Sequence, residues 1–291
     1  MKQEEIHKTV REQYGKIAKQ SGSCCGESAQ QITNCCGANT GAVAGISKKL
    51  GYSDQDLNMV PESANLGLGC GNPVALASLK KGEIVLDLGS GAGFDSFLAA
   101  AKVGTAGKVI GIDMTAEMLD KARENARKGN YTNVEFRLGE IENLPVADNF
   151  ADVVISNCVI NLASNKQRVF DEAFRVLKPG GRLMVSDLVI LKELPSCILT
   201  SIDAYIGCVA GAMEKNEYME TIGKAGFEAV KIIEESAYPL SSAMTDIISK
   251  VTADGLGLTD QQVQDASESI ASIKVQGIKP APETKSISGM N

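Results

Sequence analysis

The sequence lacks tryptophan and has a single histidine, His7, so a metal site built mainly on imidazole is excluded. It also lacks an excess of positive charge. The 29 Lys and Arg residues face 36 Asp and Glu residues, and the resulting net charge of −7 disfavours binding to nucleic acid. No run of about 18 apolar residues is present, and the charged start Met1–Glu5 is not a signal peptide. We therefore expect a cytoplasmic protein that binds neither nucleic acid nor a membrane.

An alternation of strand and helix patterns begins near residue 83 and predicts an α/β fold with a doubly wound, Rossmann-like parallel sheet. The pattern predicts strands at 84–88, 108–113, 133–138, 152–156 and 181–189, and helices at 94–103, 116–128 and 165–177. This core is expected to span residues 73–190. An N-terminal part, 1–72, precedes it, and a substrate-side segment, 191–291, is expected to complete the sheet.

The two flanking parts have weaker patterns. In the N-terminal part we predict an amphipathic helix over 3–19, with His7 on its surface, and a short helix over 42–50, whereas 59–73 has the composition of a loop. The C-terminal part is predicted to contain helices at 216–225 and 260–270, strands at 228–234 and 272–278, and a frayed tail from 279.

A glycine-rich turn follows the first predicted strand, in Val85–Gly93. Glycine allows a sharp turn and a close approach of a ligand to the main chain. The spacing is GxGxG, not the GxGxxG of a dinucleotide site. Asp87, just before the turn, would repel a pyrophosphate but can receive the ammonium group of S-adenosylmethionine. Asp113, at the end of the second strand, can accept hydrogen bonds from ribose hydroxyls.

We therefore predict S-adenosylmethionine as the cofactor, with a nicotinamide-binding or non-binding α/β domain as the alternative. The residues expected at the cofactor come from the ends of four strands. They are Asp87, Gly89, Ser90, Gly91, Gly93, Asp113, Met114, Glu140, Ile141 and Asn157.

Three of the eight cysteines lie in contexts where they can converge. Cys158 follows the fourth strand, at the sheet edge where ligands bind in such folds, and Cys70 and Cys208 lie in glycine-flanked segments. Three thiolates suit a soft, thiophilic centre, and a lowered cysteine pKa would favour binding. Zinc sites usually use four ligands and often CxxC spacing, which is absent. Trivalent arsenic forms pyramidal three-thiolate complexes, and its lone pair is a nucleophile. The alternative is that each cysteine is a small core residue.

Several segments resemble the arsenite methyltransferases, S-adenosylmethionine-dependent enzymes that methylate trivalent arsenic. The resemblance runs from about Val10 to Pro280, and its most diagnostic parts are Gly67–Pro73 and Ser156–Leu162. It implies that Cys70, Cys158 and Cys208 are the catalytic ligands of arsenic, supplied as arsenite or a thiol conjugate. It also implies that Tyr14 lies over the cofactor, although ordinary packing is an equal alternative.

The same resemblance implies a fourth, N-terminal cysteine that pairs with Cys70 during turnover. Cys24, Cys25, Cys35 and Cys36 are the candidates, of which we favour Cys35 or Cys36; Cys197 matches no position of the family. Small thiols or thioredoxin are expected to restore the reduced state of a monomeric enzyme of arsenic detoxification. Two alternatives remain from the sequence: a methyltransferase of small carbon or oxygen acceptors, and a non-enzymatic protein that binds metals through thiolates.

Overall fold

The computed structural model describes residues 3–20, 38–73, 78–194, 196–199, 202–237, 265 and 268–282. Its centre is a seven-stranded sheet with the order β3-β2-β1-β4-β5-β7-β6. The strands are β1 (Ile84–Leu88), β2 (Lys108–Asp113), β3 (Val134–Leu138), β4 (Ala151–Asn157), β5 (Leu177–Ile190), β6 (Glu228–Ala237) and β7 (Ile270–Ile278). The first five are parallel, and β7 pairs antiparallel with both β5 and β6. The predicted doubly wound fold is confirmed.

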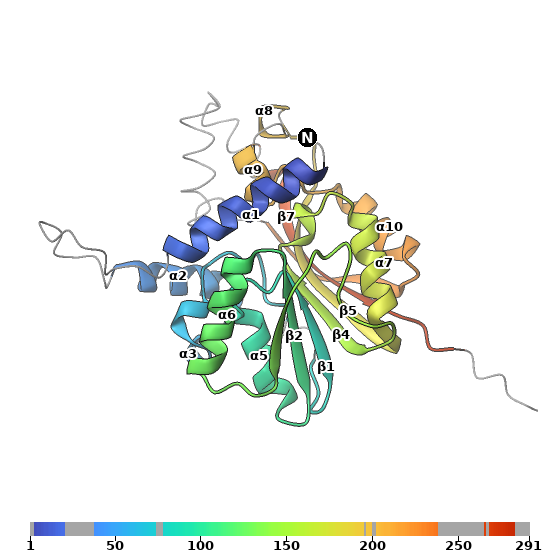
Figure 1. Cartoon of the computed structure of the whole chain (residues 1–291). Helices are drawn as coiled ribbons and strands as arrows, with labels where there is room; N and C mark the ends of the chain where they lie inside the picture. Colours follow the sequence, from blue (N-terminus) through green and yellow to red (C-terminus); the bar gives the residue numbers. More distant parts are fainter. Residues whose placement is uncertain are drawn as a thin grey trace, which may run out of the picture.

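The helices lie on both faces and at one end of the sheet. They are α1 (Gln3–Gln20), α2 (Ala38–Lys49), α3 (Asp54–Met59), α5 (Phe94–Val103), α6 (Ala116–Lys128), α7 (Lys166–Val176), α8 (Ser196–Leu199), α9 (Ile202–Ile206) and α10 (Lys215–Lys224). Figure 1 shows α3, α5 and α6 on one side of the sheet, and α7 and α10 on the other. In the part of the chain that the structure describes, no helix is long and apolar enough to cross a membrane.

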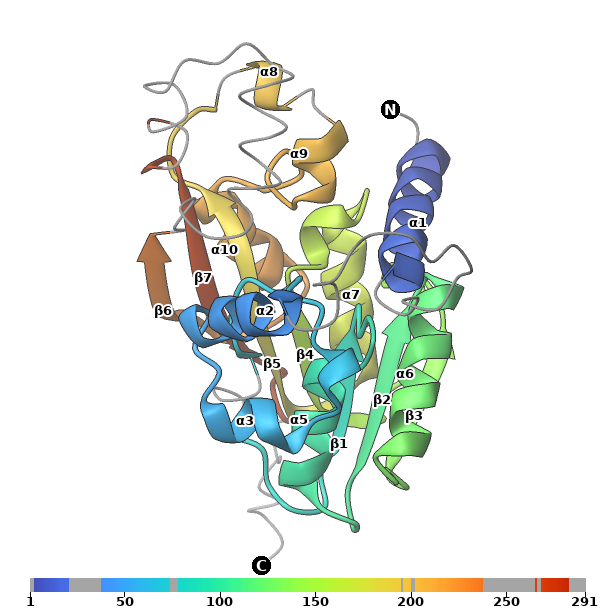
Figure 2. The same ribbon diagram turned by 90° about the vertical axis from the view of Figure 1, so that its left-hand side faces the viewer.

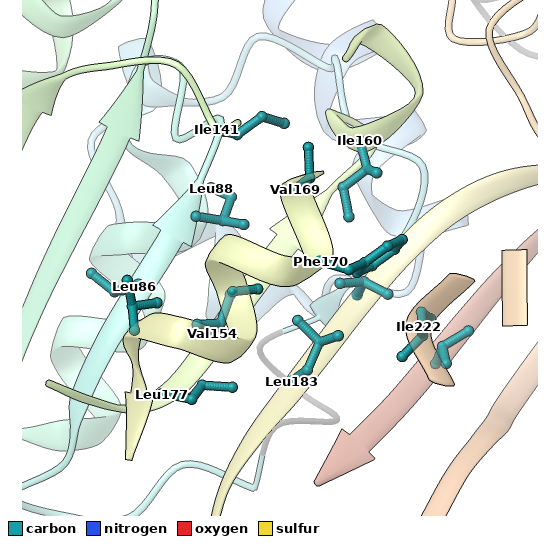
Figure 3. Close-up of a cluster of buried hydrophobic side chains, with 14 of the residues drawn as sticks. Leu86, Leu88, Ile141, Val154, Ile160, Val169, Phe170, Leu177, Leu183 and Ile222 are labelled. Atoms are coloured by element: carbon teal, nitrogen blue, oxygen red, sulfur yellow. The ribbon is translucent and has the colours of Figure 1, made fainter. Parts of the chain in front are cut away.

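Alternation along the strands produces a separate core on each face. On β1, Val85 belongs to the cluster under α5 and α6, and Leu86 belongs to the cluster under α7. Figure 3 shows the second cluster, in which Phe170 of α7 lies among side chains of the sheet and Ile222 of α10. Because both faces are covered, the central strands read as continuous apolar runs.

Most predicted elements of the core match the structure, and β1, β2, α5 and α6 match at both ends. The gap left between the predicted helix at 165–177 and the predicted strand at 181–189 is absent from the structure. The structure continues β5 back to Leu177, and a shift in its pairing with β4 between Ala151 and Val153 accommodates the extra residues. Strand β7 confirms the predicted last strand. The predicted helix at 260–270 lies mostly outside the described residues.

Helix α3 was not predicted. It begins with a capping box, in which the Ser53 hydroxyl accepts from the Asp56 backbone N–H and the Asp56 carboxylate accepts from the Ser53 backbone N–H. These two bonds satisfy donors at the helix start, and none of its residues is buried. An apolar pattern therefore does not reveal this helix.

The N-terminal helix crosses the end of the sheet at which the functional residues gather. Figure 2 shows the arrowhead of β2 pointing toward α1, with α9 at the same end of the molecule. The Tyr14 hydroxyl donates to the backbone oxygen of Ile206 in α9, at 3.3 Å. A third hydrophobic cluster forms here, and it contains Val10 together with the three cysteines of the predicted site. The division at residues 72 and 190 stays a prediction.

Candidate active site

A cavity opens at the carboxyl ends of β1, β2 and β4, beneath α1. The glycine turn forms part of its wall, with Gly89 at φ 67° and Gly91 at φ 52°. A Cβ atom on Gly89 would collide with Val159, whereas one on Gly91 would meet nothing within 4 Å. The turn thus needs glycine for its conformation, and at Gly91 the main chain is open to a ligand.

Eight of the ten residues predicted for the cofactor line this cavity: Asp87, Gly89, Ser90, Gly91, Asp113, Met114, Ile141 and Asn157. The other two, Gly93 and Glu140, are not among its lining residues. Gly93 caps α5 at φ 95°, where a Cβ would collide with Phe97 and Phe136. The Glu140 carboxylate instead lies 3.4 Å from the guanidinium of Arg11.

The cavity is acidic. Asp87, Asp95, Asp113 and Glu142 line it, and none of the described lining residues is a Lys or Arg. Burial, together with the charge of Asp95, raises the pKa of Asp87 well above its ordinary value. The pKa of Asp95 is raised to about 6, chiefly by burial. Such a cavity suits a ligand with cationic groups and opposes a pyrophosphate.

Its polar and apolar walls fit the groups of S-adenosylmethionine. Ser90 Oγ is buried and has no hydrogen-bond partner among the described residues, so a ligand can satisfy it. Asp113 accepts from the backbone N–H groups of Gly91 and Thr115, at 2.9 and 2.8 Å, which fixes its carboxylate at the strand end. Met114 and Ile141 provide apolar surface for an adenine ring.

The three predicted cysteines come together beside this cavity. Cys70, Cys158 and Cys208 are 3, 5 and 4% exposed, and Cys158 also lines the cavity. The sulfur atoms of Cys70 and Cys158 lie within 4.8 Å of each other. The Cys208 thiol donates to the Cys158 backbone oxygen at 2.8 Å, and the Cys70 thiol donates to the backbone oxygen of Ser186 at 3.4 Å.

Two of these cysteines have left-handed backbone conformations, with φ 61° at Cys158 and φ 65° at Cys208. Such values are uncommon for residues other than glycine and often occur at functional sites. The turn at Cys158 is stabilised by a hydrogen bond from the Cys158 backbone N–H to the Ser186 backbone oxygen, at 2.8 Å. The turn immediately follows β4.

Burial sets the protonation of the thiols. It raises the pKa of Cys70, and burial with the two neighbouring thiols raises the pKa of Cys158 well above its ordinary value. The lowered cysteine pKa that would favour binding is therefore not found at these two residues. Both are neutral thiols near pH 7, and they become thiolates when a thiophilic atom replaces the proton.

Asn157 connects the cavity to the loop that carries Cys70. Its side-chain oxygen accepts from the Cys70 backbone N–H at 2.9 Å, and its amide nitrogen donates to the Gly71 oxygen at 2.8 Å and to Asp95 at 2.9 Å. A Cβ on Gly69 would collide with the Asn157 side chain. Asn157 therefore contacts the Cys70 loop closely and also lines the cavity.

The prediction that His7 is a surface residue is wrong. His7 is 5% exposed, and its two ring nitrogens lie 3.3 Å from Glu140 and 3.2 Å from Glu142. The sequence contained a signal for this burial, because the spacing of His7, Val10 and Tyr14 places them on one face of a helix. Tyr14 lines the cavity, as the resemblance implied, and it also packs in the cluster of the cysteines.

Three further polar residues of the site were not predicted: Tyr52, Asp95 and Asp187. Tyr52 donates to Asp95 at 2.7 Å, and both residues line the cavity. Asp187 lies beside the thiols, and an acid inside the apolar run of β5 was a signal for it. Cys24, Cys25, Cys35 and Cys36 lie outside the described residues, as does the side chain of Cys197.

Comparisons with known proteins agree with this geometry. Residues 79–226 match a family model described as a methyltransferase domain. Together with the glycine turn and the acidic cavity, this match defines the class: the protein is a methyltransferase whose methyl donor is S-adenosylmethionine.

Its relatives define the family. An arsenite methyltransferase of Halobacterium salinarum is 47% identical over 96% of this chain and 68% of the relative. One of Aquipseudomonas alcaligenes is 34% identical over 96% of this chain and 75% of the relative. The crystal structure of an arsenic(III) S-adenosylmethionine methyltransferase from Chlamydomonas reinhardtii matches with a TM-score of 0.59 and 31% identity, covering 84% of this chain and 73% of that chain. The chain belongs to the arsenite methyltransferases, and it transfers methyl groups from S-adenosylmethionine to arsenic.

Proposed function

We propose that Cys70, Cys158 and Cys208 bind trivalent arsenic as three thiolates, next to the methyl donor in the acidic cavity. The observation that carries this proposal is the convergence of three buried thiols beside the cavity, which Cys158 lines. Exchange with arsenite balances without an external base. Each thiol proton leaves with one hydroxyl group of arsenite as water, and three arsenic–sulfur bonds replace three arsenic–oxygen bonds.

The residues of the site then act mainly by positioning. When bound, S-adenosylmethionine supplies an electrophilic methyl group on a sulfonium sulfur. The three cysteines hold arsenic so that its lone pair faces the cavity that Cys158 lines. The lone pair forms the new arsenic–carbon bond, so no residue has to remove a proton from the acceptor. Asp87 and Asp113 receive the cationic and hydroxyl groups of the donor.

Methyl transfer formally oxidises arsenic by two electrons. We propose that a pair of cysteine thiols, Cys70 with Cys35 or Cys36, supplies these electrons and forms a disulfide. Small thiols or thioredoxin would reduce the disulfide again. A reducing, cytoplasmic environment and a monomeric enzyme fit this cycle, and arsenic detoxification is its expected biological role.

Replacing one thiolate tests the site directly. Cys158→Ser is expected to abolish arsenite methylation and to leave the affinity for S-adenosylmethionine within about twofold, because the sulfur bonds arsenic whereas the donor is held by other residues. Methylated arsenic is measured by chromatography and donor binding by equilibrium dialysis. A Cys158→Ser enzyme of normal activity would refute the three-thiolate site. Cys197→Ser, outside the proposed site, is the matched control.

A further inference from the structure

A buried carboxyl group faces the thiols and has no part in methyl transfer as described above. Asp187 of β5 is fully buried, and its Oδ2 atom accepts from the Tyr218 hydroxyl at 2.7 Å. Its Oδ1 atom has no hydrogen-bond partner among the described residues. An unsatisfied buried oxygen of this kind costs about 1–3 kcal/mol, so its presence needs a reason.

The surroundings of Asp187 indicate a cation as that reason. The sulfur atoms of Cys70 and Cys158 and a carboxylate oxygen of Asp187 all lie within 4.8 Å of one another. The Cys208 thiol, on a different segment, donates to the Cys158 backbone oxygen at 2.8 Å. A sulfur-rich group of donors with one oxygen thus comes from four distant parts of the chain.

Trivalent arsenic and zinc differ in the number and type of donor atoms that they need. Trivalent arsenic forms a pyramid with three thiolates and keeps its lone pair, so it needs no fourth donor. Zinc takes four donors in a tetrahedron, and the three cysteines alone leave it one donor short. With bonds of about 2.0–2.3 Å, a tetrahedral zinc holds its donors roughly 3.3–3.8 Å apart. The donor atoms of Cys70, Cys158 and Asp187 would move together by about 1.0–1.5 Å at most to reach that geometry, and the Cys208 thiol would turn toward them from the Cys158 backbone oxygen.

We propose that Cys70, Cys158, Cys208 and Asp187 form a tetrahedral site for a divalent cation of the zinc class, which competes with arsenic for the thiols. Binding replaces the thiol protons and neutralises part of the negative charge of the four donors. The bound cation blocks methylation because it occupies the thiolates and offers no lone pair to the methyl group. The inference rests on the same thiols as the proposed function, and Asp187 is the residue that separates the two.

The test uses zinc as an inhibitor of the full-length enzyme. The inhibition constant for zinc and the KM for arsenite are measured for the wild type and for Asp187→Asn, which keeps the shape and an acceptor for Tyr218. The ratio of the zinc inhibition constant to the arsenite KM is expected to rise at least tenfold in Asp187→Asn, because a neutral amide is a poor ligand for zinc. Glu172→Gln removes another buried carboxylate, one that holds the Leu144 backbone and Arg175, and should leave the ratio unchanged.

A direct measurement covers the case in which Asp187→Asn is inactive. Cadmium is titrated into each variant, and its binding is followed by the thiolate-to-cadmium charge-transfer absorbance. One equivalent of arsenite is then added, and the loss of that absorbance is recorded. The other cysteines are the same in every variant, so they do not affect the comparison. The inference is overturned if Asp187→Asn leaves the ratio within threefold of the wild type, or weakens arsenite and the divalent cation equally. The Cys158→Ser test of the proposed function does not depend on either outcome.

Discussion

The two halves of the candidate active site are built in different ways. The donor half comes from the ends of neighbouring parallel strands, where one motif of nine residues carries both the turn and Asp87. The thiol half joins Cys70, Cys158, Asp187 and Cys208 from four separate segments, through side-chain and turn contacts. The first half is therefore encoded locally, and the second exists only after the chain has folded. Changes to the two halves should differ accordingly.

Varying the pH should give the largest difference between the halves. The raised pKa values of Cys70 and Cys158 leave both as thiols near neutrality. Below its pKa, the thiolate fraction of a cysteine rises about tenfold for each pH unit. The rate of arsenite association, followed by arsenic–thiolate absorbance in rapid mixing, should therefore keep rising up to pH 9. A plateau of the association rate below pH 8 would show that the pKa values of these thiols are not raised.

Altering the donor half should affect only the donor. Asp113→Asn removes the charge that is expected to accept the ribose hydroxyls, which corresponds to about 1.5 kcal/mol or roughly a tenfold rise in Kd for S-adenosylmethionine. Calorimetric titration measures the donor, and a parallel titration with arsenite serves as the control. Unchanged donor affinity would remove Asp113 from the ribose assignment.

Asn157 contacts both halves, so a change at this residue should affect the binding of both arsenite and the methyl donor. Asn157→Ala removes the acceptor of the Cys70 N–H and the donor to Asp95. The free energy of unfolding should fall by about 1–3 kcal/mol, and arsenite KM should rise by about fivefold, more than the KM of the donor. Urea unfolding and steady-state kinetics measure these effects. Asn157→Asp keeps the acceptor and should recover part of the arsenite KM; equal effects on both KM values would argue against a special link to Cys70.

The smallest effect is expected at the helix that covers the site. Tyr14→Phe removes the hydrogen bond to Ile206, two residues before Cys208. A neutral hydrogen bond contributes about 0.5–1.5 kcal/mol, so arsenite KM should rise by about threefold. Tyr131→Phe, which removes a comparable bond to the Met59 backbone away from the cavity, is the matched control. A larger loss in the control than in Tyr14→Phe would contradict a role for α1 at the site.

The same contrast explains what the sequence could predict. The bounds of β1, β2, α5 and α6 follow from short-range apolar patterns and glycine positions, so they were predicted correctly. The partners of His7 are two glutamates more than 130 residues away, and no local pattern identifies them. Asp187 left only a weak signal, an acid within a buried strand. Residue spacing left the role of each cysteine open, and the family resemblance provided the set of three.

The backbone of the thiol half has a consequence for how such a site persists. Cys158 and Cys208 occupy left-handed conformations that glycine or asparagine would adopt with less strain. A non-glycine residue in such a conformation costs on the order of 1–3 kcal/mol. Selection for thermal stability alone would therefore tend to remove these cysteines. Under the proposed function, arsenic binding offsets this cost, so that foldability and catalysis favour different residues at the same two positions.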